Sequence, residues 1–307
     1  MANFLSAETI PKDVKEAIIP LENNRLRIVL SSGFNLLFHT LNLYDQLTGS
    51  YHKYRDTFPD KSQILRDKGQ FRELSRNQID KFYAALAIES AFDATSVIQK
   101  AKKYHNLGDI LENEWDTLYG KYWVDNYTRI SQNFDKLCTL DWRGITSRME
   151  EVTGYKFKPD ILVVPAEGSG QAAHYRMDAN LSIGNFMDGG FFHEGLHLLL
   201  RKQWAEDELV KGILEAHGGY MDKFWKDNSK ERIEQAVVVS LDSLLRSRSD
   251  AESYFGGCMV GDLYPYFYGE MRDWYETKNK KALSDLVYGI LKRHESEIFS
   301  QERDVIR

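Results

Sequence analysis

The chain has 307 residues, a length that allows either two lobes or one large domain with a substantial core. Hydrophobic residues make up 42% of the chain and charged residues 28%, proportions typical of soluble globular proteins. Lys and Arg number 40 and Asp and Glu number 46, which gives a net charge of −6. This mild acidity and the lack of a basic stripe argue against a nucleic-acid-binding protein.

No apolar run approaches the roughly 18 residues that a membrane span requires, so no span is predicted. The start of the chain, MANFLSAETIPKDVKEAI, lacks the basic, apolar and small-residue regions of a signal peptide. We therefore expect a soluble, cytoplasmic protein, although a leader already removed would leave the same sequence. Cys138 and Cys258 cannot form a disulfide framework and are expected to be buried thiols.

The first half of the chain is predicted to be largely helical. The first twenty residues are weakly patterned and predict a loose arm, followed by a short strand at 26–30. Residues 50–77 are polar and interrupted by Pro and Gly, which predicts loop and short helix. Apolar residues at helical spacing predict helices over 34–47, 78–104, 108–137 and 142–152.

The pattern changes after residue 155. The apolar run 161–164, closed by Pro165, predicts a buried strand. In the segment 174–183 polar and apolar residues alternate, which is typical of one strand with a buried and an open face. Helical patterns then return at 189–203, 206–218, 229–247, 262–277 and 281–298.

This order of helices, a small sheet and more helices predicts a predominantly helical α+β fold. The change in pattern divides the sequence into a mainly helical N-terminal region, 1–154, and a second region, 155–307, which holds the candidate metal-binding segment and a helical C-terminal part. The boundary is one of sequence character and need not separate two domains. No oligomer is predicted.

The segment that carries chemistry is HEGLH, residues 193–197. On a helix His193 and His197 lie one turn apart on the same face, so both imidazoles can reach one metal ion at about 2.0–2.1 Å. Glu194 is rotated by about 100° from His193, so it is placed to activate a metal-bound water rather than to bind the metal. This is the general-base arrangement of H-E-x-x-H metal hydrolases.

Chance is the competing explanation of this motif. In a chain of this length, the string arises by chance in on the order of one sequence in a hundred. Imidazole and carboxylate groups that are merely buried on an apolar helix cost free energy, which argues against coincidence. Neither a glycine-rich phosphate loop nor a G-x-S-x-G nucleophile elbow is present.

HEGLH, preceded by the alternating segment HYRMDANLSI, resembles the zincin superfamily of zinc metallopeptidases. The resemblance covers about residues 155–250. It implies a small sheet whose edge strand precedes the active-site helix, lies beside it and pairs with extended substrate. The metzincin extension would require Gly and His where this chain has Leu200 and Gln203. What remains is a gluzincin-like pattern, in which a Glu on a later helix is the third ligand.

Glu234 is the first candidate for the third ligand, because it lies on the apolar stripe of the predicted helix 229–247. Glu215 and His217 are alternatives closer in sequence to His197, although Gly218 and Gly219 suggest that their helix ends there. Glu231 shares part of the face of Glu234 and is more easily explained as an exposed charge.

Other side chains are candidates for binding substrate or stabilising the transition state. His174 opens the polar face of the predicted strand, and Tyr266 is central in a cluster with Tyr264 and Tyr268; either could donate to a developing oxyanion. The tyrosine cluster is more often core or rim packing. Arg176 could bind a substrate carboxylate, or it could be a solvated charge. The remaining histidines are expected to be structural: His39, His52, His105 and His294.

The sequence therefore predicts a zinc-dependent hydrolase, most simply a metallopeptidase acting on a peptide or protein substrate. One Zn²⁺ per chain would be held by His193, His197 and Glu234, with Glu194 as the catalytic base. Two alternatives stay open: a zinc hydrolase of non-peptide amides or esters, and a non-catalytic binding or regulatory protein on a zincin scaffold.

Overall fold

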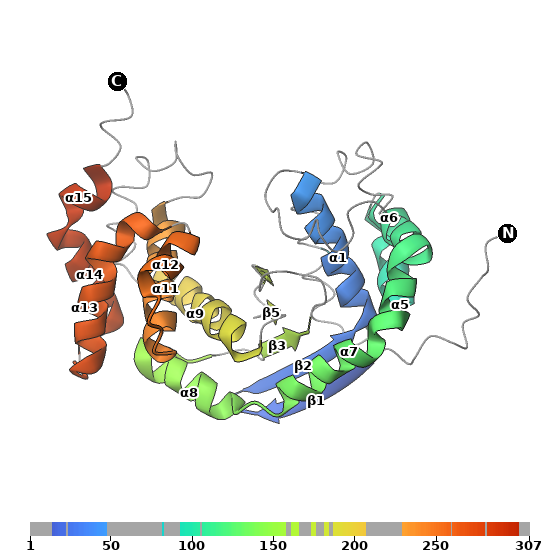
Figure 1. Ribbon diagram of the computed structural model, residues 1–307, viewed down its shortest axis with the longest axis horizontal. Helices are drawn as coiled ribbons and strands as arrows, with labels where there is room; N and C mark the ends of the chain where they lie inside the picture. Colours follow the sequence, from blue (N-terminus) through green and yellow to red (C-terminus); the bar gives the residue numbers. More distant parts are fainter. Residues whose placement is uncertain are drawn as a thin grey trace, which may run out of the picture. The chain divides into compact units, whose positions relative to one another are not determined.

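The structure is a computed structural model (Figure 1), and it describes most of the chain. The described residues are 14–22, 24–47, 82, 93–104, 106–157, 161–165, 173–175, 181–183, 187–206, 229–258, 260–279 and 281–300. They divide into two compact units. The first comprises Met1–Trp142 and Lys158–Phe191, and the second comprises Arg143–Phe157 and Phe192–Arg307. Each unit therefore draws residues from both sequence regions, 1–154 and 155–307.

The described strands form one sheet in the first unit, in the order β1-β2-β3-β5-β4. The inner strands β2, β3 and β5 are parallel, and β1 and β4 are antiparallel to their neighbours. The interior of the sheet is apolar, because Leu26, Ile28 and Val164 are fully buried. The strands are β1 Val14–Pro20, β2 Arg25–Ser31, β3 Ile161–Val164, β4 Ala173–Tyr175 and β5 Leu181–Ile183.

Helices complete the first unit, and α7 packs against β2 (Figure 1). The buried side chains of Phe34 and Trp123 contribute to this core. Between α6 and α7 the helical path loosens into the π-helical turn η2. The elements are α1 Ser32–Leu47, α5 Ala94–Ala101, α6 Leu107–Glu114, η2 Trp115–Tyr119 and α7 Gly120–Cys138.

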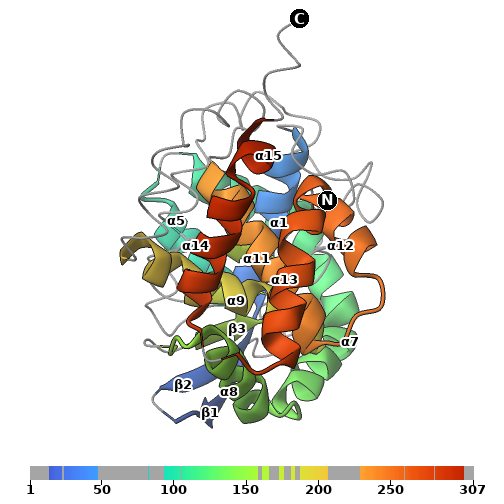
Figure 2. The same cartoon turned by 90° about the vertical axis from the view of Figure 1, so that its left-hand side faces the viewer.

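The described part of the second unit is helical. In it α11 packs against α12 and α13, and α13 and α14 lie side by side (Figure 2). Val237, Phe255 and Phe267 are fully buried among these helices. The elements are α8 Trp142–Thr153, α9 Met187–Glu206, α11 Ser229–Leu245, α12 Ala251–Gly257, the 3₁₀ turn η3 Gly261–Leu263, α13 Tyr264–Glu276, α14 Leu283–Arg293 and α15 Glu295–Ser300. The first residues of α8 and α9 belong to the first unit.

The predicted α+β class, mostly helical with a small sheet, is confirmed. No helix in the described residues is long and apolar enough to span a membrane. The predicted helix 206–218 lies mainly outside the described residues.

The single strand predicted over 174–183 is wrong. The segment instead contributes two short antiparallel strands, β4 and β5, with His174 opposite Ser182. Alternation with a period of two does not distinguish one long strand from two short ones, because the pattern can run through the connection. Asp178 and Asn180, in the connecting segment, are residue types that favour turns.

Four further predictions needed correction. The N-terminal twenty residues are not wholly a loose arm, because β1 pairs along its full length with β2. The helix predicted over 78–104 begins anew at Ala94, since the backbone of Asp93 is extended and its side chain caps α5. The helix predicted over 281–298 is broken at His294 into α14 and α15. Cys138 and Cys258 are half-buried, not fully buried.

Candidate metal centre

The motif residues His193, Glu194 and His197 lie on α9, within the second unit. The two imidazole rings are one helical turn apart, with centroids separated by 5.0 Å and planes inclined by 71°. Glu194 and His197 are buried, and the side chain of His193 is 14% exposed. The apolar neighbours Leu196 and Leu200 are fully buried and anchor the helix. The predicted helical placement of the motif is therefore confirmed.

His197 is paired with a buried carboxylate on α11. Its Nδ1 lies 2.5 Å from Oε1 of Glu234, which is only 2% exposed. The carboxylate accepts a hydrogen bond, so Nδ1 carries the proton and Nε2 carries the lone pair in the neutral ring. Histidines that bind metals through Nε2 are commonly held in this way by a carboxylate at Nδ1.

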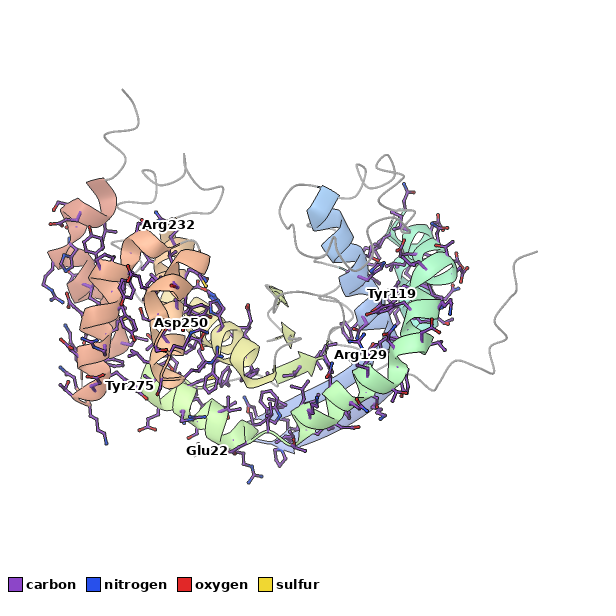
Figure 3. All side chains as sticks on the ribbon, in the orientation of Figure 1. Glu22, Tyr119, Arg129, Arg232, Asp250 and Tyr275 are labelled. Atoms are coloured by element: carbon purple, nitrogen blue, oxygen red, sulfur yellow. The ribbon has the colours of Figure 1, made fainter. Side chains whose placement is uncertain are left out.

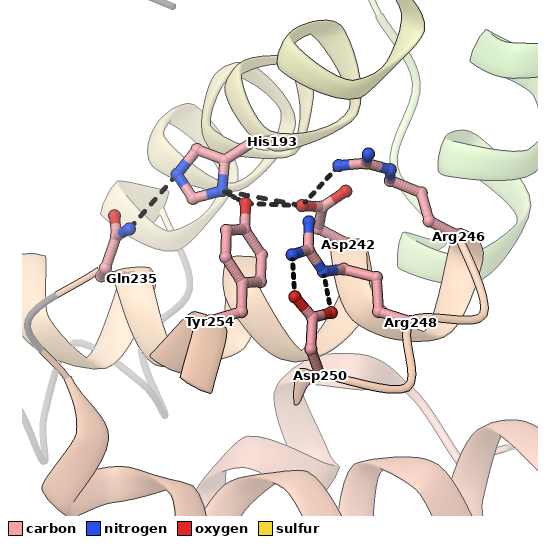
Figure 4. Close-up of polar contacts among 7 residues, drawn as sticks. All are labelled: His193, Gln235, Asp242, Arg246, Arg248, Asp250 and Tyr254. Atoms are coloured by element: carbon pink, nitrogen blue, oxygen red, sulfur yellow. Dashed lines mark hydrogen bonds and ion pairs between the residues drawn. The ribbon is translucent and has the colours of Figure 1, made fainter. Parts of the chain in front are cut away.

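His193 is connected to a second buried carboxylate of α11 through a tyrosine (Figure 4). Its Nδ1 lies 2.9 Å from the phenol oxygen of Tyr254, on α12. The same phenol donates to Oδ2 of Asp242 at 2.6 Å, and Asp242 is fully buried. Neither Tyr254 nor Asp242 was predicted from the sequence to be a site residue.

Two arginines of the turn between α11 and α12 surround this pair (Figure 4). Nη1 of Arg246 lies 3.6 Å from Oδ2 of Asp242. The guanidinium of Arg248 stacks 3.9 Å from the ring centroid of Tyr254, within cation–π range. Arg248 itself donates two hydrogen bonds to Asp250, at 2.9 and 2.7 Å. The turn thus supports both members of the Asp242–Tyr254 pair.

Burial determines the protonation of the groups around His193. It raises the pKa of Asp242, an effect opposed by the hydrogen bond from Tyr254 and by the charges of Arg246 and Arg248. Burial and the nearby Asp242 also raise the pKa of Tyr254 far above its ordinary value of 10, so the phenol keeps its proton at neutral pH. Burial likewise raises the pKa of Cys258 to about 11, so this thiol is neutral and unsuited to nucleophilic catalysis.

Gln235 contacts the other nitrogen of His193. Its amide nitrogen lies 3.2 Å from Nε2 (Figure 4). An amide N–H donates, so Nε2 accepts and carries the lone pair of the ring. A metal ion that binds His193 through Nε2 must therefore displace the Gln235 amide.

The donor types of this neighbourhood fit a zinc ion. Two imidazoles and one carboxylate, together with water, form one of the ligand sets that catalytic zinc takes. Among the described residues, however, no three groups of His, Cys, Asp or Glu are already arranged to hold an ion. The structure brings Glu234 to Nδ1 of His197, and Gln235 to Nε2 of His193. The residues fit zinc in their chemistry, and closing the site requires a local rearrangement.

Comparisons with known proteins give no relative. No family model, no curated protein and no solved structure matches this chain. The description of this centre rests on its residues alone.

Among the other predicted site residues, only the tyrosines of α13 are described with their side chains, and none of their described contacts is with the cluster. His174 lies on β4, in the first unit, and its side chain is outside the described residues. Tyr266 lies on α13, where its ring is 5.2 Å from that of His294. Tyr264 and Tyr268 stack on each other at 5.2 Å, as expected of packing residues. The description of the structure does not extend to Arg176, Glu215 and His217, nor to the side chain of Glu231.

One signal in the sequence could have identified Asp242. Like Glu234, it is an acidic residue within an apolar helical stretch, VVVSLDSLL, and the same argument applies to both. Tyr254 had no such signal. It lies on the short helix α12, which the sequence analysis did not predict, and it reaches His193 only through the tertiary packing of α12.

Proposed function

We propose that this chain is a zinc-dependent metallopeptidase of the zincin, gluzincin-like type, with one zinc ion per chain held by His193, His197 and Glu234. The observation that carries the proposal is that both histidines of HEGLH connect at Nδ1 to buried carboxylates of α11. The connection is direct for His197 and passes through Tyr254 for His193. Such partners fix the tautomer of metal-binding imidazoles and raise their basicity. To serve as the third ligand, Glu234 would have to leave Nδ1 of His197, from which it accepts a hydrogen bond in this structure.

Glu194 is the catalytic base in this proposal. Zinc, when bound, lowers the pKa of a water ligand toward ~7 and polarises the carbonyl of the substrate. Glu194 follows His193 directly on α9 and is buried, so it can take a proton from the attacking water and deliver it to the leaving amine.

The substrate would pair with the sheet edge. Among the described strands β4 pairs only with β5, and an extended peptide would pair with β4 in this proposal. We assign the oxyanion donor to His174 or Tyr266, and a substrate carboxylate to Arg176. These assignments rest on the sequence.

The test is hydrolysis of a mixed fluorogenic peptide library by zinc-loaded wild type and by Glu194→Gln. We expect the variant to keep its zinc and to lose activity by about 10²–10⁴-fold, since it cannot accept the proton. Equal activity of the two proteins would overturn the role of Glu194. A zinc-loaded wild type that cleaves esters but no peptides would favour the hydrolase of non-peptide substrates, and one that cleaves neither would favour a binding protein.

A further inference from the structure

We propose that Tyr254 and Asp242 are positioning residues that hold His193 in the Nδ1-protonated tautomer and so present Nε2 to the metal. This inference rests on the proposed function for its purpose. The hydrogen-bond arrangement itself can be tested without any metal.

The count of protons decides the tautomer. The phenol of Tyr254 has one proton, and it donates this proton to Oδ2 of Asp242 at 2.6 Å. Toward His193, 2.9 Å away, the phenol oxygen can then only accept, so Nδ1 must carry the ring proton. Gln235 leads to the same result independently, because its amide donates to Nε2 at 3.2 Å. Two separate contacts, one at each nitrogen, agree on one tautomer.

The charges around Asp242 are arranged so that Tyr254 is its hydrogen-bond donor. Arg248 is committed to Asp250 through two hydrogen bonds, and Arg246 approaches Asp242 only to 3.6 Å. A fully buried carboxylate is costly unless it receives a hydrogen bond, and here the short bond comes from the phenol. An aspartate serving only to pair with arginine would be expected to take the two-pronged bond that Asp250 receives.

Arg248 covers one face of the Tyr254 ring. Its guanidinium lies 3.9 Å from the ring centroid, and Asp250 fixes the guanidinium in turn. The phenol oxygen is thereby kept between Asp242 and His193. Side-chain contacts run without a break from Asp250, in an exposed turn, to the motif (Figure 4). They pass through Arg248 and Tyr254 and end at His193.

The first part of the test is the tautomer of His193 in zinc-free wild type, measured by two-dimensional ¹⁵N–¹H NMR of the imidazole, with His193→Gln for assignment. We expect the proton on Nδ1 at neutral pH. In Tyr254→Phe the acceptor at Nδ1 is lost and only Gln235 still favours this tautomer, so the share of the Nε2-protonated form should rise above that in wild type. A wild-type ring with its proton on Nε2 would overturn the inference.

The second part is zinc affinity, measured by competition with a chromogenic chelator. We expect Tyr254→Phe to weaken zinc binding by about 10–100-fold, the usual effect of removing an outer partner of a metal ligand. Asp242→Asn, which can still accept from the phenol but lacks the charge, should weaken it less. The matched control is Tyr275→Phe, which removes a phenol hydroxyl from an exposed position of α13 (Figure 3) and should leave affinity unchanged.

The outcomes separate the two proposals. Unchanged affinity in a folded Tyr254→Phe would overturn the inference and leave the metallopeptidase standing. If wild type binds no zinc, the proposed function fails, while the tautomer of His193 still decides on the hydrogen-bond arrangement. If Tyr254→Phe does not fold, the wild-type tautomer and the affinity of Asp242→Asn decide.

Discussion

Two acidic residues on one apolar helix carry the candidate centre. Glu234 and Asp242 are both buried on α11. Removing a carboxylate without a partner from water at such a position would cost roughly several kcal/mol of free energy. Glu234 contacts an imidazole directly, and Asp242 reaches one through a phenol. Because each carboxylate orients a residue of the HEGLH motif, we interpret both as parts of the site and not as chance burial.

The pairing of Glu234 with His197 should contribute measurably to stability. Glu234→Ala removes the acceptor at His197 Nδ1 and leaves a buried donor, so we expect the free energy of unfolding of the zinc-free protein to fall by about 1–3 kcal/mol. Urea denaturation followed by circular dichroism measures the loss. Glu252→Ala, an exposed position on α12, is the control and should change stability by at most about 0.5 kcal/mol. A loss in Glu234→Ala no greater than in this control would contradict a structural pairing.

The parts of this site that depend on helical spacing could be predicted from the sequence. The spacing of His193 and His197 required only a helix, and the structure has one. Glu234 was recognisable because a carboxylate on an apolar stripe needs a partner. The partnership of Tyr254 with His193 joins residues 61 positions apart in the sequence, and no local period encodes such a contact.

Individual elements were predictable where burial of one face, or of the whole strand, leaves a clear pattern of apolar residues. The strands at 26–30 and 161–164 and the helix starting near 34 follow from apolar patterning alone. The interruption before α5 does not follow from apolar patterning. It depends on the side chain of Asp93, which accepts a hydrogen bond from the backbone N–H of Ser96 at 2.9 Å. Capping competes with helix continuation, and a pattern of apolar residues is insensitive to that competition.

The cap of α5 gives a prediction at this scale. Asp93→Ala removes the acceptor of Ser96 N–H and of the Ser96 hydroxyl, so we expect a loss of about 1 kcal/mol in the free energy of unfolding. Urea denaturation measures this loss, and the slope of the free energy of unfolding against urea concentration should stay unchanged. Asp273→Ala on α13, whose side chain is 77% exposed, serves as the control. Equal midpoints for the two variants would show that the cap contributes nothing.

The stability of the whole molecule should depend on pH through a buried histidine of the first unit. His39 on α1 is fully buried, with Nε2 2.5 Å from Oε1 of Glu114, and its ring stacks on Tyr119 at 4.6 Å. Burial lowers the pKa of His39 below its ordinary 6.5, although Glu114 acts in the opposite direction. The folded protein therefore takes up this proton less readily than the unfolded chain.

The sign of the effect follows from this difference in pKa. The contribution of His39 to the free energy of unfolding is fully present above pH 6.5, the pKa of histidine in the unfolded chain. It is lost as the pH falls toward the lower pKa of His39 in the folded protein. We expect this residue to lower the free energy of unfolding by up to about 1.4 kcal/mol per pH unit in that range. Urea midpoints between pH 7.5 and pH 5, taken as about the interval in which histidine titrates, measure it. His39→Gln should flatten the profile, whereas His294→Gln, at a position with 31% exposed side chain, should not. A profile unaffected by His39→Gln would contradict this account.

The most direct test of the central claim is the metal content of the purified protein, measured by mass spectrometry for wild type, His193→Ala and Glu234→Ala. The account predicts about one zinc ion per wild-type chain and loss of the ion in both variants. Retention in Glu234→Ala alone would move the third ligand to Glu215 or His217. A folded wild type that holds no zinc, even after zinc is added back, would contradict the assignment of a metallopeptidase.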